Sequence, residues 1–149
     1  VCNFYPDRLT DLCANASVIP AVDQVELHPF FQPGRHLQAI AGAMSPAPRH
    51  WGPLAEGTHG IFQNEVLSAI GKKYDKTVAQ VVLRWNVQRG VSIIPKSVHR
   101  NRMEENLAIW DLLLVMRTWP LLLRWIWAQR DHRSLFSRNS EMAQQLEDP

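Results

Sequence analysis

The sequence predicts an α/β fold in which helices cover parallel strands. Segments with helical spacing of apolar residues alternate with short apolar runs, and capping or turn residues separate them. The clearest repeat joins a helix from Thr77, a terminating Gly90, an apolar run over 91–94, a polar turn and a further helix. This order is typical of parallel strands connected through helices.

The first helix and strand follow from local patterns. Pro6 to Asn15 is expected to be a helix with Pro6 in its first turn, and Leu9, Leu12 and Cys13 are expected to face inward. Val22 to His28 is expected to be a strand. Its alternation gives one face with polar side chains (Gln24, Glu26, His28) and an opposite face (Asp23, Val25, Leu27). Because parallel strands usually bury both faces, the polar face needs partners or a ligand.

Two amphipathic helices are expected in the middle of the chain. One runs from about Asn64 to Tyr74, and its buried side contains Val66, Leu67, Ile70 and Tyr74. The next begins at a capping box formed by Thr77 and Gln80. Its apolar residues lie at helical spacing (Val78, Val81, Val82, Trp85).

Residues 93–106 have the pattern of an anion-binding turn before a helix. If Asn101 caps that helix, Glu104 completes a capping box and the free amides favour an anion. Arg102, Glu105 and Asn106 then share one face. An apolar stripe occupies another face, which is expected to pack against the rest of the protein (Met103, Leu107, Trp110).

A phosphorylated adenosine fits this pattern. Arg102 offers a planar fork to a phosphate, Lys96 adds a point charge, and Glu105 and Asn106 can bind the purine edge. An exposed Arg102–Glu105 ion pair is an equally simple explanation. For His28, a structural role is favoured over a general base or metal ligand, because no carboxylate or cysteine stands at a ligand spacing around it.

Four strings resemble the aldo/keto reductases in order and approximate spacing. They are Val1-Cys-Asn-Phe4, Asp23-Gln-Val-Glu-Leu-His-Pro29, Trp51-Gly-Pro-Leu-Ala-Glu-Gly57 and Ile94-Pro-Lys-Ser-Val98. The resemblance covers residues 1–32 and 51–111, and it points to the microbial branch that includes 2,5-diketo-gluconate reductases. It implies a partial (β/α)8 TIM barrel, the C-terminal half with about strands 5 to 8. It also implies hydride transfer from NADPH to small aldehydes and ketones, without a metal.

The resemblance assigns cofactor-binding roles to eight residues. Asn3 and Gln24 would bind the nicotinamide carboxamide, and Trp51 would stack on the nicotinamide ring. The 2'-phosphate would be held by Lys96, Ser97 and Arg102, and the adenine by Glu105 and Asn106. Cys2 replaces the usual serine as a weaker donor, and Asp23 replaces an asparagine. Packing is the alternative role for Trp51.

The resemblance assigns no catalytic residue in this chain. The family's tyrosine, aspartate, lysine and histidine precede the Asn3 motif, and neither Tyr5 nor Tyr74 has the required context. The 149 residues also fall below the roughly 250 typical of such a barrel. The expectation is a cofactor-binding part that is inactive alone, with a separately encoded N-terminal half as a candidate partner.

Two segments depart from the family, residues 33–50 and residues 112–149. Pro46 and Pro48 would each remove a hydrogen-bond donor from a central strand. The tail after Asp111 has arginine but no lysine, and it holds three of the six tryptophans. Out-of-frame translation, as in a pseudogene, is the hypothesis for both segments. Translating the neighbouring frames of the DNA tests it.

A non-catalytic interaction protein is the alternative function. Its arginine- and tryptophan-rich tail would bind a membrane surface or a partner, although its apolar runs are too short to span a membrane.

Sixteen basic and fourteen acidic residues give a net charge of +2, which does not indicate nucleic-acid binding. Cys2 and Cys13 form neither a disulfide framework nor a zinc site. The expected location is the cytoplasm.

Overall fold

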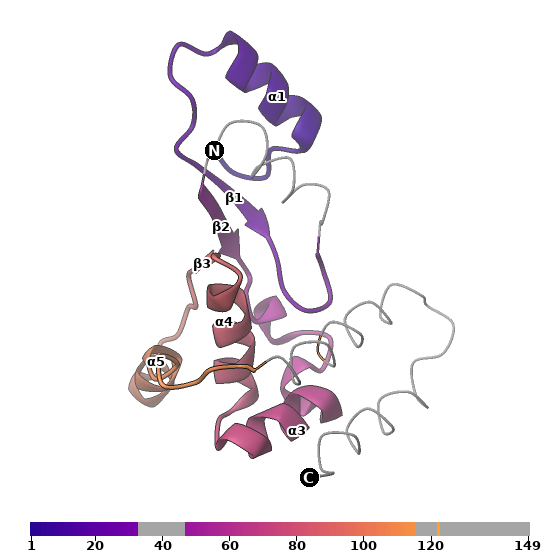
Figure 1. Ribbon diagram of the computed structural model, residues 1–149, viewed down its shortest axis with the longest axis vertical. Helices are drawn as coiled ribbons and strands as arrows, with labels where there is room; N and C mark the ends of the chain where they lie inside the picture. Colours follow the sequence, from indigo (N-terminus) through magenta and orange to yellow (C-terminus); the bar gives the residue numbers. More distant parts are fainter. Residues whose placement is uncertain (33–46, 116–121, 123–149) are drawn as a thin grey trace, which may run out of the picture.

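Within the described residues, three parallel strands in chain order form a sheet. The computed structural model describes residues 1–32, 47–115 and 122 (Figure 1). Strands β1 (Val22–Glu26), β2 (Ala47–Trp51) and β3 (Ser92–Ile93) are neighbours in that order. The first residues of the chain extend the sheet beyond β1, because Cys2 forms a parallel bridge with Gln24 and the Asn3 amide donates to the Gln24 carbonyl at 2.8 Å.

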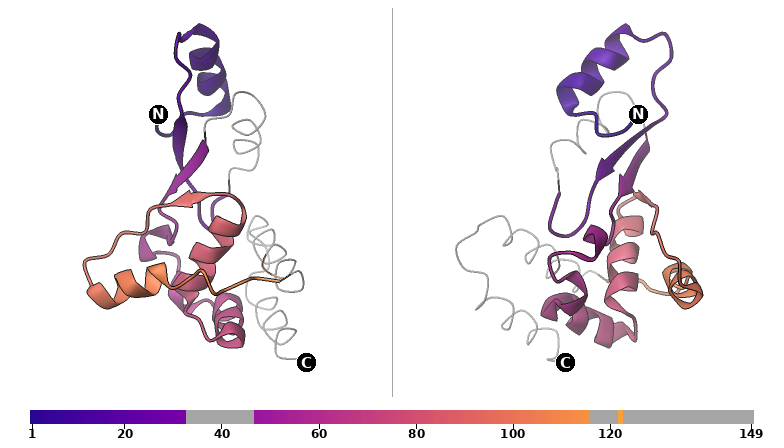
Figure 2. Two further views of the ribbon diagram at one scale, coloured as in Figure 1. Left: turned by 60° about the vertical axis from the view of Figure 1, so that its left-hand side comes forward. Right: turned by 180° about the vertical axis from the view of Figure 1, so that it is seen from behind.

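The described residues contain four α-helices around the ends of this sheet. They are α1 (Pro6–Asn15), α3 (Glu65–Tyr74), α4 (Val78–Gln88) and α5 (Arg100–Leu107), and two short 3₁₀ turns, η1 (Ala55–Gly57) and η2 (Ile61–Gln63), follow β2. Figures 1 and 2 place α1 at one end of the sheet and α3 and α4 toward the other, with α5 beside α4. The expected α/β alternation is therefore present.

Helices α1, α3 and α4 confirm the sequence prediction, and α3 and α4 each begin at a local side-chain cap. The Asn64 side chain accepts from the Leu67 amide at 3.0 Å and starts α3. The capping box that starts α4 is complete. The Gln80 amide donates to Thr77 Oγ1 at 3.3 Å, and the Thr77 amide donates to Gln80 Oε1 at 2.9 Å.

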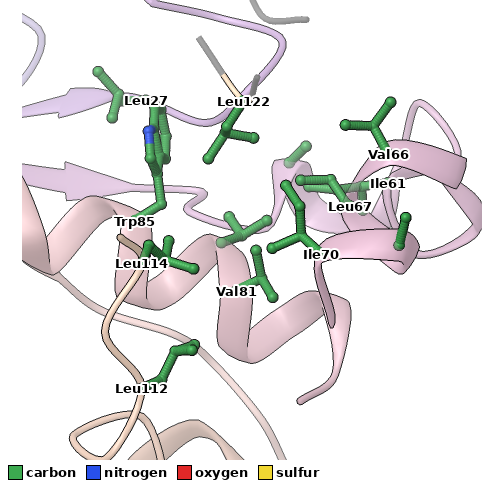
Figure 3. Packing of buried hydrophobic residues seen from close by; sticks show 13 residues of the cluster. Leu27, Ile61, Val66, Leu67, Ile70, Val81, Trp85, Leu112, Leu114 and Leu122 are labelled. Atoms are coloured by element: carbon green, nitrogen blue, oxygen red, sulfur yellow. The ribbon is translucent and has the colours of Figure 1, made fainter. Parts of the chain in front are cut away.

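The main core lies between α3, α4 and the end of β1. Trp85 and Leu27 are fully buried, and Figure 3 shows Ile70 of α3 and Val81 of α4 pointing toward one another. A smaller cluster under α1 contains Leu9 and Cys13, with Phe4 packed against them. Leu12, predicted to face inward with them, is half-buried.

Described residues after Asp111 join the main core. Leu112, Leu114 and Leu122 are each at most 4% exposed and belong to the same cluster as α3 and α4. Leu113 and Val115 are exposed. Residues 116–121 and 123–149, with the tail's tryptophans and arginines, lie outside the described residues, as does the segment 33–46 with Pro46. No helix within the described part of the chain is long and apolar enough to cross a membrane.

Strand β1 confirms the predicted alternation but ends two residues early. Asp23 and Val25 are buried and alternate with half-buried neighbours. The strand ends at Glu26 because the next residues turn back on themselves. The His28 amide donates to the Phe31 carbonyl at 3.1 Å, and the Phe31 amide donates to the His28 carbonyl at 3.0 Å.

The middle strand contains Pro48, which was predicted to remove a hydrogen-bond donor from a central strand. Pro48 lies within β2 opposite Asp23 of β1, and β2 is the middle strand of the sheet. The strand tolerates it because β3 pairs only with Arg49 and His50, so that Pro48 has a partner strand on one side.

The buried strand expected over 91–94 is shorter than predicted, and its side chains are more exposed to solvent. Only Ser92–Ile93 pair, and Ile94 is 50% exposed, since β3 is the edge of the described sheet.

Helix α5 differs from its prediction in two ways. It begins at Arg100 after His99, and no side chain caps it, so Asn101 is not the cap. Glu104 instead accepts from Arg100 Nε at 2.9 Å. The prediction that the apolar stripe packs is wrong as well, because its three residues are 45–71% exposed (Met103, Leu107, Trp110).

Candidate cofactor-binding site

Asn3, Gln24 and Trp51 come together although they are far apart in the sequence. Trp51 Nε1 donates to Asn3 Oδ1 at 3.0 Å across 48 residues. The Asn3 backbone pairs with Gln24, and β1 pairs with β2 as far as Glu26 opposite Trp51. The sequence motifs therefore meet on three adjacent strand segments.

The backbone at Asn3 turns sharply to present this side chain. Its φ is +56°, a left-handed conformation in which asparagine is enriched among non-glycine residues. The buried Asp23 carboxylate accepts from the Phe4 amide at 3.4 Å and so holds the chain next to the turn. The replacement of asparagine by Asp23 thus acts on local backbone bonding. Cys2 is exposed on the same segment.

These three side chains leave polar groups for a ligand. The bond from Trp51 occupies Asn3 Oδ1 and leaves Nδ2 as a donor. Gln24 is half-buried, and its side-chain amide has no hydrogen bond within the described ranges. A donor and an adjacent free amide can bind a carboxamide, and the half-buried indole can offer its ring face.

A second group of predicted residues lies between β3 and the first turns of α5. The Ser97 hydroxyl accepts from the His99 amide at 3.1 Å, which turns the chain into the helix. Lys96 and Arg102 are exposed, and neither has a carboxylate partner in the part of the chain that the structure describes. The neighbouring Arg100, in contrast, is paired with Glu104.

Glu105 does not pair with Arg102 among the described residues. Its Oε1 instead accepts a hydrogen bond from Thr77 Oγ1 at the start of α4. The simple alternative of an Arg102–Glu105 ion pair is therefore wrong, and Arg102 remains available to an anion. Asn106, the other predicted adenine-binding residue, is half-buried.

Sequence reasoning missed the residues that hold α5 in place. Gln80 Nε2 donates to the carbonyls of Glu105 at 3.2 Å and Ala108 at 2.9 Å. Lys76 Nζ lies 2.8 Å from Asp111 Oδ2, and its hydrogen bond lowers the pKa of that carboxyl. The capping box was visible in the sequence, but nothing local indicated that it also contacts another helix.

His28 lies in a closed environment rather than in an open site. It is 4% exposed, its Nε2 is 3.1 Å from Glu26 Oε1, and its Nδ1 accepts from the Phe30 amide at 3.3 Å. Burial lowers the pKa of His28, although Glu26 opposes this shift. The described residues contain no group of three side chains suited to a metal ion. The structural role of His28 stays a prediction with these contacts in its favour.

Comparisons with known proteins identify the family. The aldo/keto reductase family model matches residues 1–122. The chain is 44% identical over 115 residues to the 9,11-endoperoxide prostaglandin H2 reductase of Trypanosoma cruzi, covering 76% of this chain and 40% of that protein. It is 41% identical over 114 residues to methylglyoxal reductase DkgA of Salmonella typhimurium, covering 76% of this chain and 41% of DkgA.

A solved structure shares the fold. A mutant of Gox0644 in complex with NADPH superposes with a TM-score of 0.76 at 34% identity, covering 83% of this chain and 45% of that one. The chain thus spans about two fifths of the length of the curated relatives above, and its fold corresponds to part of the barrel. The resemblance predicted from four sequence strings is confirmed, and this chain belongs to the aldo/keto reductase family.

Proposed function

We propose that this chain is the C-terminal half of an NADP(H)-dependent aldo/keto reductase barrel, about strands 5 to 8, and that it carries the cofactor site. The observation that carries the proposal is the hydrogen bond between Trp51 and Asn3, beside Gln24. It joins the predicted nicotinamide-binding residues from separate motifs into one surface.

At the nicotinamide end, each residue has a distinct task. The bond from Trp51 fixes the rotamer of Asn3, so that Nδ2 donates to the carboxamide oxygen. The free Gln24 amide can accept from the carboxamide nitrogen. The Trp51 ring, held by its own indole N–H, covers one face of the nicotinamide and limits its access to water.

At the phosphate end, the unpaired cations favour the 2'-phosphate of NADP(H). An exposed cation that already has a carboxylate gains little from a second anion, but Lys96 and Arg102 have none among the described residues. Arg102 supplies a bidentate fork and Lys96 a point charge. A cofactor without this phosphate loses these interactions, which is the physical basis for preferring NADPH over NADH.

Carbonyl reduction needs a proton donor in addition to the cofactor. NADPH supplies the hydride when it is bound, and an acid must lie within hydrogen-bond reach of the carbonyl oxygen. Tyr5 is 63% exposed just before α1, and the Tyr74 hydroxyl, beside the main core, accepts from the Val115 amide at 3.4 Å. We therefore propose that the 149 residues bind the cofactor but do not reduce a small aldehyde unless another part of the barrel supplies the acid.

Fluorescence titration of the full chain with NADPH and NADH tests the proposal. We expect tighter binding of NADPH. Loss of a charge-assisted contact worth about 1.5–3 kcal/mol should lower NADPH affinity roughly tenfold to a hundredfold in Arg102→Ala, with little change for NADH. Arg100→Ala is the matched control, because Arg100 is the adjacent helix cation already paired with Glu104.

Equal affinity for the two cofactors, or equal effects of both substitutions, would contradict the phosphate assignment. The catalytic part of the proposal is tested separately. NADPH absorbance should stay constant when the chain is mixed with a small aldehyde, and turnover by the chain alone would refute it.

A further inference from the structure

Helix α5 is held against α4 by polar contacts rather than by a core. None of its side chains is buried, and its apolar residues face solvent. Its contacts with α4 run through Thr77 and Gln80, while Lys76 bonds the Ala108 carbonyl and Asp111 just beyond its end. Hydrogen bonds at the start of α4 therefore help to hold α5, together with buried Ile109 just beyond its end.

The donors and acceptors in this contact match one to one. Thr77 Oγ1 accepts from the Gln80 amide and donates its own hydrogen to Glu105 Oε1. Gln80 Oε1 accepts from the Thr77 amide, and its Nε2 donates to the Glu105 and Ala108 carbonyls. The carboxylate also lies at the N-terminal end of α4, where the helix dipole attracts a negative group.

We propose that Thr77 is a positioning residue that sets the base selectivity of the cofactor site through Glu105. Thr77 holds Oε1 of Glu105, while Oε2 has no partner in the described part of the chain. The held carboxylate then presents Oε2 to the exocyclic amine of a purine. The inference rests on the proposed function, because it assumes that the adenine of the cofactor lies against α5.

Comparing NADPH with its hypoxanthine analogue tests this role. The analogue carries an oxygen in place of the amine, so that a fixed Glu105 carboxylate repels it instead of accepting from it. We expect the unmodified chain to bind NADPH about tenfold or more tightly than the analogue, the size of a charge-assisted hydrogen bond. Thr77→Ser retains both the cap and the donor, and it should keep this preference.

Two substitutions place another residue type accepted at a helix N-cap and remove the hydroxyl donor. Thr77→Asp is a good cap that cannot donate and that repels Glu105, and Thr77→Gly is a tolerated cap without a side chain. Both should reduce the preference for NADPH over the analogue to about twofold or less. Thermal unfolding followed by circular dichroism confirms that each variant is folded, so failure of one leaves the other informative.

The outcomes separate this inference from the proposed function. If the Asp and Gly variants fold and keep the full base preference, Thr77 is only a cap and the inference is overturned. If the unmodified chain binds NADPH but does not distinguish the two bases, the inference fails while the phosphate assignment stands. If the chain binds neither cofactor, the proposed function itself fails.

Discussion

Replacing Gly71 with alanine should destabilise the protein, although local helix propensity predicts the opposite. Gly71 lies in α3, where alanine is favoured over glycine by about 1 kcal/mol. A Cβ at this position would lie 2.4 Å from the carbonyl oxygen of Lys76 and 3.5 Å from its carbonyl carbon. The obstacle is backbone rather than a flexible side chain, so the chain must move.

The geometry around Gly71 opposes that movement. Asp75 ends α3 with a φ of +52°, and the Lys76 amide donates back to the Gly71 carbonyl at 2.9 Å. Overpacking costs about 1–3 kcal/mol, and a rigid backbone contact belongs at the upper end of this range. Subtracting the propensity gain of about 1 kcal/mol leaves a net loss of about 2 kcal/mol in the free energy of unfolding.

Urea denaturation followed by far-ultraviolet circular dichroism measures this difference. Ser68→Ala, in the same helix, is the control, and it should change stability by no more than about 0.5 kcal/mol. Because Lys76 and Thr77 hold α5, Gly71→Ala should also weaken NADPH binding. A variant that is about 1 kcal/mol more stable than the unmodified chain would refute the close approach.

Three further predictions concern pH and the cofactor site. Burial lowers the pKa of His28 in the folded state, so the unfolded chain takes up the proton first as the pH falls. The free energy of unfolding should therefore decrease below the ordinary pKa of 6.5, and His28→Asn should reduce this decrease in denaturation curves at about pH 7 and 5.5. The hydrogen bond with Lys76 also lowers the pKa of Asp111, so the pair stabilises the fold above the ordinary pKa of 3.8, and this stabilisation is lost as the pH falls through the folded pKa. At neutral pH, Asp111→Asn should accelerate amide hydrogen exchange in α5. Unchanged exchange would show that the pair does not hold the helix. Trp51→Phe keeps a ring but removes the donor to Asn3, and it should weaken NADPH binding roughly twofold to tenfold in fluorescence titrations without changing the unfolding midpoint by much; an undiminished affinity would contradict the role of this bond.

Much of the fold could be predicted because its causes lie within a few residues. Asn64 and Thr77 cap their helices through bonds to residues three positions away, and the alternation along β1 follows from strand geometry. The errors occur where distant packing decides the outcome. The spacing of Met103 and Leu107 indicated a buried face, but no described element covers that side of α5.

The sequence by itself determined the family, the helices with local caps and the identity of the candidate cofactor-binding residues. Only the tertiary structure decided how those residues are held. Asn3 meets Trp51 across 48 residues, and Glu105 meets Thr77 across 28. Caps and periodicity depend on neighbours within about one helical turn, whereas these contacts depend on how whole strands and helices pack. The pairing of Glu105 with Thr77 instead of Arg102 could therefore be found only in the folded chain.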